Sequence, residues 1–190
     1  MILFFDTETT GIPRNYKAPA TDLANWPRLV QLAWILTNED GSPIEEVEYI
    51  VRPSGFLIPD DAAAIHGINT EVALAKGVPL VEVMNHLQRS LLKVNKAIAH
   101  NLQFDEKIIG AEFLRCQLPN PIEALPRACT MKASTALCQL PGPYGYKWPT
   151  LNELHWYLFG SGMGEAHQAL LDTRACARCH FELRRRGVMV

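Results

Sequence analysis

The sequence predicts an α/β layered fold in which strands of mixed direction alternate with helices. The almost wholly apolar run at residues 1–5 has the composition of a strand buried on both faces. Two strand-like segments, residues 29–37 and 44–52, are joined by a loop rich in turn-forming residues, which indicates an antiparallel pair. Farther along, a short strand candidate is followed at once by a helical pattern, which is typical of a parallel crossover.

The second half of the chain supplies most of the predicted helices. Apolar positions at helical spacing begin at Leu80, directly after Pro79. The crossover strand is expected at residues 97–99, and an edge strand at 128–130. A capping box that starts at Thr150 opens a helix, and Gly187 is a suitable residue to follow the last one. The helices after the crossover strand are expected at residues 104–116, 131–138, 150–159 and 168–186.

Composition limits the class of protein. The 190 residues, 48% of them hydrophobic and 20% charged, predict a single domain over residues 1–190 with a core that needs no disulfide. The net charge of −2 supplies no broad basic field for binding nucleic acid. No apolar stretch is long enough to span a membrane, and residues 1–5 are too short for a signal peptide. We therefore expect a cytoplasmic protein with no membrane association.

The cysteines predict reduced thiols rather than a disulfide framework. There are five, an odd number, and their spacing is irregular. Cys176, Cys179 and His180 have the spacing of half a zinc site, but no second Cys/His pair stands nearby to complete it. These three are interpreted as small buried residues of a helix.

Candidate catalytic residues begin at Asp6 and Glu8, which follow the apolar run. Residues two apart on a strand point to the same face, so two carboxylates would project together. Each disfavours ionisation of the other, and a hard divalent cation is the usual compensation. The alternative is a solvated acidic turn.

Two further acids are placed where they could join this pair. Asp105 lies in the first turn of the helix after the crossover strand, near the carboxyl end of the first strand; the alternative is a helix-capping acid. His167 and Asp172 can share a site only if the histidine precedes the last helix and the aspartate lies within it. Three glycines at residues 160–164 make the connecting segment adaptable, although an incidental surface histidine would fit the same pattern.

Taken together, these pieces resemble a known family. The matching segments are residues 4–11 (FFDTETTG), residues 99–105 (AHNLQFD), and His167 with Asp172 five residues on. They resemble the DEDDh family of 3′-5′ exonucleases, the DnaQ-like group that includes RNase T and the proofreading epsilon subunit of bacterial DNA polymerase III. Residues 65–68 (IHGI) and 76–79 (KGVP) also resemble family segments, so the similarity covers nearly the whole chain.

The resemblance implies a fold, a metal site and a mechanism. The fold is RNase H-like, a mixed five-stranded sheet flanked by helices. Two Mg²⁺ or Mn²⁺ ions would be held by four acids, with Asp6 bridging both, Glu8 and Asp172 on the water-side ion, and Asp105 completing the set. Paired metals can stabilise the attacking and leaving oxygens of a phosphoryl displacement. His167 would act as general base towards the attacking water.

The resemblance also implies substrate contacts. Thr9, Thr10 and Gly11 match positions that hold the terminal nucleotide. Ile65, His66 and Ile68 are suited to an apolar wedge against the last bases; the alternative for Ile65 and Ile68, from their helical spacing, is a place in the core. Contact is also expected from His100 and Asn101, although His100 fits a structural role as well. Two loops, at residues 12–28 and 139–149, carry aromatic and basic residues. Those of the first suit a single strand, with Trp26 as an alternative anchor of the loop, and those of the second suit either a rim that guides the strand or a hydrophobic lid.

The function implied is a metal-dependent 3′-5′ exonuclease that releases nucleoside 5′-monophosphates from single-stranded or frayed 3′ ends, with DNA as the favoured polymer. One alternative is an exoribonuclease of the RNase T or oligoribonuclease kind. Another is a non-catalytic module that binds nucleic acid or a polymerase, which the complete set of five catalytic residues argues against. Candidate partners are the 3′ end of single-stranded DNA or RNA and a DNA polymerase or repair complex.

Overall fold

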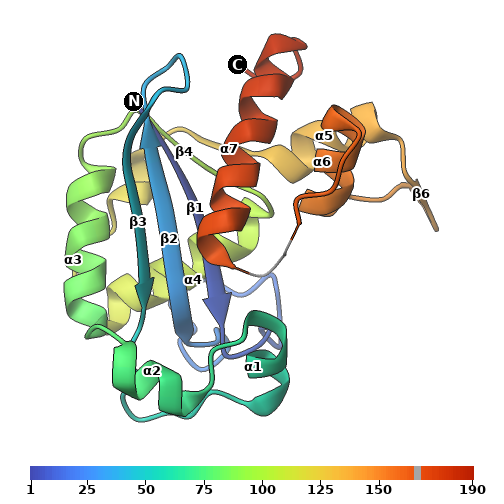
Figure 1. Ribbon diagram of the computed structural model, residues 1–190. Coiled ribbons are helices and arrows are strands. Elements are labelled where there is room, and N and C mark those ends of the chain that lie inside the picture. Colours follow the sequence, from blue (N-terminus) through green and yellow to red (C-terminus); the bar gives the residue numbers. More distant parts are fainter. Residues whose placement is uncertain (165–167) are drawn as a thin grey trace.

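A five-stranded sheet forms the centre of the molecule, and helices cover both of its faces (Figure 1). The computed structural model describes residues 1–164 and 168–190. The strand order is β3-β2-β1-β4-β5, in which β1, β2 and β3 are antiparallel neighbours while β4 and β5 run parallel to β1. The strands are β1 (Ile2–Thr9), β2 (Leu29–Thr37), β3 (Pro43–Ile50), β4 (Lys96–Ala99) and β5 (Arg127–Cys129). The mixed five-stranded sheet is therefore confirmed.

Most predicted helices are present with ends within two residues of those expected. The capping box of Thr150 and Glu153 forms as predicted, and Gly187 follows the last helix in a left-handed conformation. The helices are α1 (Asp60–His66), α2 (Thr70–Lys76), α3 (Leu80–Leu91), α4 (Leu102–Arg115), α5 (Thr130–Cys138), α6 (Leu151–Phe159) and α7 (Ala169–Arg185).

Five short elements and one strand end were not predicted. Helices α1 and α2 have seven residues each, which is too short for apolar periodicity to identify them. The 3₁₀ turn η1 (Pro121–Ala124) and the small hairpin of β6 (Pro141–Gly142) and β7 (Gly145–Tyr146) are shorter still. The first strand continues past residue 5 to Thr9, because β2 pairs with its polar residues as far as Thr9.

The two faces of β1 pack against different helices. Odd-numbered Leu3 and Phe5 belong to the largest core cluster, with the apolar residues of α3 and α4. Even-numbered Ile2 and Phe4 pack on the other face with Cys176 of α7. The period-2 alternation of a strand thus decides which helix each β1 side chain meets, including the polar ones that follow.

The interpretation of the Cys-x-x-Cys-His segment is confirmed. Cys176, Cys179 and His180 are all buried in α7, and the five cysteines are free thiols. The ring of His180 packs against Phe4 and Phe181, and burial lowers the pKa of His180 to about 4. Among the described residues, no helix has the length and apolar character that crossing a membrane requires.

A buried carboxylate ties the 12–28 loop to the sheet and to α4. Glu112 of α4 is fully buried, and its Oε1 accepts hydrogen bonds from the backbone N–H of Leu29 (2.9 Å), from Arg28 (3.1 Å) and from Arg115 (2.9 Å). Trp26 in the same loop is also buried and donates its indole N–H to the carbonyl of Pro19. Trp26 is therefore the anchor of this loop, the structural alternative considered for it.

We predict that Glu112→Ala lowers the free energy of unfolding by about 3–5 kcal/mol, because it leaves two arginines and a buried N–H without their acceptor. Urea unfolding followed by circular dichroism measures this. The matched control is Glu182→Ala, which removes a carboxylate that is partly exposed, unlike that of Glu112, and that also binds two arginines, Arg185 and Arg186. A midpoint shift no larger for Glu112→Ala than for this control would contradict the assignment.

Candidate active site

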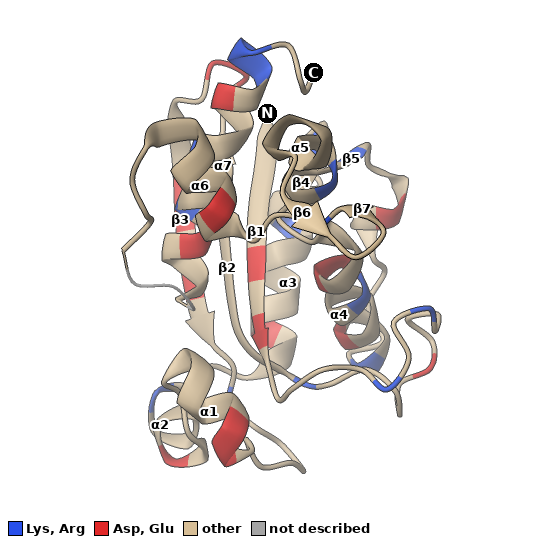
Figure 2. Cartoon of the chain, turned by 90° about the vertical axis from the view of Figure 1, so that its right-hand side faces the viewer, with Lys and Arg blue, Asp and Glu red and all other residues tan. Residues whose placement is uncertain are grey.

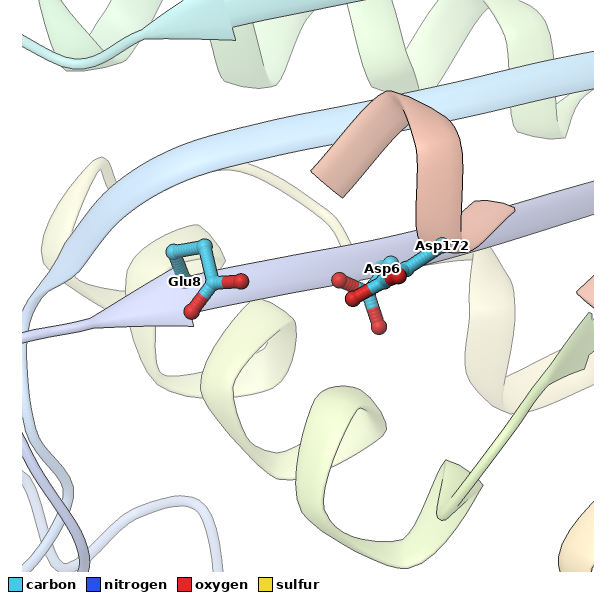
Figure 3. A group of neighbouring side chains, drawn as sticks. All are labelled: Asp6, Glu8 and Asp172. Atoms are coloured by element: carbon cyan, nitrogen blue, oxygen red, sulfur yellow. The ribbon is translucent and has the colours of Figure 1, made fainter. Parts of the chain in front are cut away.

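Three carboxylates from two elements meet over the carboxyl-terminal half of β1 (Figure 3). Asp6 and Glu8 come from β1, and Asp172 comes from the first turn of α7. One oxygen from each can be chosen so that all lie within 4.8 Å of one another. Asp6 and Glu8 lie on the even-numbered face of β1, against which α7 packs, as the two-residue spacing predicts. Among residues 1–164 and 168–190, this is the one such group of acidic, His or Cys side chains.

The sheet itself fixes the start of α7 and hence Asp172. Gln168, the residue before the helix, makes no side-chain cap hydrogen bond. Instead the N–H of Ala169 donates to Oε1 of Gln31 on β2 (3.4 Å), and the N–H of Leu170 donates to Oε1 of Glu48 on β3 (3.3 Å). These acceptors satisfy two of the four N–H groups that a helix start leaves without intrahelical partners.

Gln31 and Glu48 also stand in line with the acids. In the antiparallel ladders Gln31 is directly opposite Glu8, while Ala33 lies between Asp6 and Glu48. The residues that cap α7 are therefore in cross-strand register with the carboxylates of β1. Gln31 is not among the predicted site residues, although a glutamine inside the apolar segment LVQLAWILT was the available signal.

Asp105 approaches β1 from the side of α4 rather than that of α7. It is buried, and its Oδ1 accepts a hydrogen bond of 2.7 Å from the hydroxyl of Thr7. Thr7 lies between Asp6 and Glu8 and points to the opposite face of β1. The structure thus joins three of the four predicted acids in one compact group, with Asp105 bound to the residue between two of them.

The acids are held in an environment that favours protonation. Burial, then the charges of Asp105, Glu8 and Asp172, raises the pKa of Asp6 well above its ordinary value. Burial, followed by the charges of Asp172 and Asp105, raises the pKa of Glu8 to about 7. Burial raises the pKa of Asp105 to about 7 against the opposing effect of the Thr7 hydrogen bond. Desolvated like charges of this kind are compensated by a bound cation.

The ligand set fits a hard divalent ion. Carboxylate oxygens are what Mg²⁺ and Mn²⁺ prefer, whereas a zinc site of the structural kind would use Cys and His. The described members of the cluster offer oxygen alone.

A hollow of about 190 Å³ lies beside Glu8. Its lining includes Thr9, Gly11, Ile65 and His66, four of the predicted substrate contacts. Ile65 is 59% exposed, so it faces the hollow and solvent, whereas Ile68 is the member of that pair in the core. The Thr9 hydroxyl donates to the carbonyl of Gly11, and the Thr10 hydroxyl accepts from the N–H of Arg28, so both shape the turn that follows β1.

The other predicted contacts lie on the α4 side. The contacts of His100 match its structural alternative, because its ring nitrogens are engaged by Thr130 (2.9 Å) and by the carbonyl of Pro149 (3.0 Å). Burial lowers the pKa of His100 to about 4, so the ring is neutral. Asn101, with a left-handed backbone, precedes α4 and lines a second hollow. His167 lies outside the described residues.

Comparison with known proteins decides the family. The model of the exonuclease family named for RNase T matches residues 3–179. The chain belongs to this exonuclease family. The resemblance to DEDDh 3′-5′ exonucleases is thereby confirmed, and with it the prediction that the chain is a nuclease-family enzyme. No curated protein sequence matches the chain.

Solved exonuclease structures share the fold. E. coli exonuclease I in complex with a dA16 oligonucleotide superposes with a TM-score of 0.74 at 21% identity, over 97% of this chain and 41% of that one. Another exonuclease I structure gives a TM-score of 0.75 at 24% identity, over 97% and 40%. Exonuclease I from Methylocaldum szegediense gives 0.73 at 23% identity, also over 97% and 40%. The RNase H-like fold is confirmed, and this exonuclease-family chain spans about two fifths of the length of these proteins.

We predict that Glu8→Gln stabilises the metal-free protein at about pH 8 and not at about pH 4. A carboxyl whose pKa is raised on folding contributes its stability below its unfolded pKa, and that contribution is lost as the pH rises through about 7. The amide resembles the protonated acid, so the gain at about pH 8 should be about 1–2 kcal/mol, or about 2–6 °C in melting temperature.

Calorimetry in EDTA at both pH values checks this. Glu71→Gln, a change of the same kind on the exposed surface of α2, is the control and should shift neither melting temperature. A Glu8→Gln protein that melts below the wild type at about pH 8 would show that the acids are not in mutual repulsion.

We also predict that Gln31→Leu lowers kcat for exonuclease activity by about tenfold, because a small misplacement of Asp172 misaligns the site. The lost helix acceptor should lower the free energy of unfolding by only about 1 kcal/mol. The control is Glu46→Ala, which removes an ion pair at the surface between β3 and Arg174 of α7. Equal kcat values for the two variants would refute a positioning role for Gln31.

Proposed function

We propose that the chain is a metal-dependent 3′-5′ exonuclease that hydrolyses the terminal phosphodiester of single-stranded or frayed DNA and releases nucleoside 5′-monophosphates. The observation that carries the proposal is the convergence of Asp6, Glu8 and Asp172 within 4.8 Å beside an open hollow, in a chain of the exonuclease family. Single-stranded DNA is chosen because related exonuclease I structures hold dA16 and dT13 oligonucleotides.

Asp6, Glu8 and Asp172, with Asp105 beside them, are proposed to hold two divalent ions, Mg²⁺ or Mn²⁺. Such ions would supply charge stabilisation to the attacking and leaving oxygens of an in-line displacement. The positive charge of such ions would lower the raised pKa values of Asp6 and Glu8 and so favour their carboxylate forms. Buried Asp105 is oriented by the Thr7 hydroxyl, which limits the positions it can take towards Asp6.

The remaining residues of the chain would position the substrate and move the proton. The hollow beside Glu8, with exposed Ile12 and Ile65 at its rim, would take the terminal nucleotide. Gly11, whose φ of 139° suits glycine, leaves backbone exposed for close approach. His167 is proposed as the general base, since the resemblance to the family assigns that role to the histidine five residues before Asp172 in the sequence. The free thiols support a reducing compartment, the cytoplasm.

We predict that the purified chain shortens a 5′-labelled single-stranded DNA from its 3′ end with Mg²⁺ or Mn²⁺ and that EDTA stops the reaction. Asp172→Asn should lower kcat by on the order of 10³-fold, because it removes a charge that the transition state needs. Denaturing gel electrophoresis of the products, with chromatography of the released mononucleotide, measures both.

Glu71→Gln on the surface of α2 is the control and should retain the wild-type rate. Faster shortening of an RNA of the same sequence would favour the exoribonuclease alternative. If neither polymer is shortened by the wild type and Asp172→Asn is indistinguishable from it, the proposed function is wrong.

A further inference from the structure

A groove extends from the hollow beside Glu8 across the start of α4. Phe104 lines both that hollow and a neighbouring cavity of about 450 Å³. Tyr16, Lys17 and Gln103 in turn line both this cavity and a third of about 570 Å³. The three hollows are therefore neighbours, and we call the two that lie beyond the acidic site, of about 450 and 570 Å³, the outer groove.

Segments far apart in sequence form its walls. Tyr16 and Lys17 come from the 12–28 loop, Gln103 and Phe104 from the first turn of α4, and Trp148 from the segment after the β6–β7 hairpin. Figure 2 shows this loop on one side of α4 and the hairpin on the other, in the view in which the acidic part of β1 faces the reader. The two loops singled out in the sequence therefore flank one surface.

The groove carries aromatic rings that are about half exposed. Trp148 is 58% exposed and Tyr16 is 48% exposed, although both line the 450 Å³ cavity. The ring of Tyr16 lies 6.4 Å from that of Phe104, and the ammonium of Lys132 lies 5.8 Å from the ring of Trp148. Exposed rings next to cations are what unpaired bases stack on in proteins that bind single strands.

Its charge is opposite to that of the molecule as a whole. The chain has a formal net charge of −2, yet the 570 Å³ cavity is lined by four cations and one carboxylate. The cations are Lys17, Lys107, Arg127 and Lys132, and the carboxylate is Glu106, which pairs with Arg127 at 3.4 Å. A concentrated positive surface of this kind attracts a polyanion locally.

We propose that the outer groove binds the nucleotides upstream of the scissile bond, with bases stacked on Tyr16 and Trp148 and phosphates near Lys17 and Lys107. This inference rests on the proposed function, since it assumes that a 3′ end occupies the acidic site. The occupant is single-stranded DNA, because paired bases do not present their faces to the rings. The groove thereby supplies the binding energy and the strand selectivity that the net charge of the chain does not.

The test compares a long substrate with a minimal one. A single-stranded DNA of about 12 nucleotides reaches the groove, whereas the p-nitrophenyl ester of thymidine 5′-monophosphate occupies the acidic site alone. In Trp148→Ala the ratio of kcat/KM for the oligonucleotide to that for the ester should fall by about tenfold. Lys17→Ala combined with Lys107→Ala should lower the same ratio and reduce the salt dependence of oligonucleotide binding by about one in log–log slope.

Two controls match these variants. Tyr144→Ala removes a fully exposed ring from the β6–β7 hairpin, and Tyr144 lines neither cavity. Lys93→Ala removes an exposed cation just after α3. Both should keep the wild-type ratio. Trp148 and the two lysines are surface residues, so thermal melting should show folded variants.

Fluorescence anisotropy supplies a second readout that does not need turnover. Labelled single-stranded DNA should bind Asp172→Asn protein with a Kd about tenfold lower than that of the Trp148→Ala form of the same protein. The outer-groove proposal is wrong if Trp148→Ala changes neither this Kd nor the ratio of kcat/KM values. It is also wrong if the protein binds a blunt duplex of the same sequence with equal affinity. If the wild type hydrolyses the ester but the groove variants leave the ratio and the Kd unchanged, the outer-groove proposal is wrong and the proposed function stands. An ester left intact by the wild type counts against the proposed function, and the anisotropy result then decides the groove separately.

Discussion

The rest of the structure depends on two carboxylates, Asp6 and Glu8, that lie on the buried central strand β1. β1 is hydrogen-bonded on both sides, by β2 and β4, and its first four residues are enclosed by helices. The same strand then places Asp6 and Glu8 where burial and mutual repulsion raise their pKa values. A flexible loop would relax away from such repulsion, whereas Asp6 and Glu8 are held by the ladder with β2, which runs to Thr9. The rigid sheet therefore keeps the carboxylates close together in an arrangement that a cation can bind.

The alternation of β1 distributes the site between two helices. Its even-numbered face meets α7 and brings Asp172 to Asp6, while its odd-numbered face meets α4 and brings Asp105 to Thr7. The site therefore requires that both helices start in the right place. For α7 that start is set by acceptors from neighbouring strands rather than by a cap in its own sequence. The sheet determines the position of the ligands twice, once through its own residues and once through the helix it caps.

Charge in this molecule is organised locally. The acids gather at one point of β1, and cations gather along the outer groove a short distance away. The basic run at the end of α7 is not part of that arrangement: Arg185 and Arg186 pair with Glu182, and Arg184 donates to the carbonyl of Glu39. The net charge of −2 consequently says little about the surface that a polyanion would meet.

The sequence by itself determined the sheet, the main helices and the acids, because each of these has a local signature. The strand of residues 29–37, the capping box at Thr150 and the spacing of Asp6 and Glu8 can all be recognised within a few residues. Only the tertiary structure decided the rest. Three contacts join residues that lie 30 to 138 positions apart in the sequence. They are the hydrogen bonds to both His100 nitrogens, the capping of α7 by Gln31, and the place of Tyr16 and Trp148 in one groove. Such contacts leave no periodic pattern, since they depend on how layers pack rather than on how one segment folds.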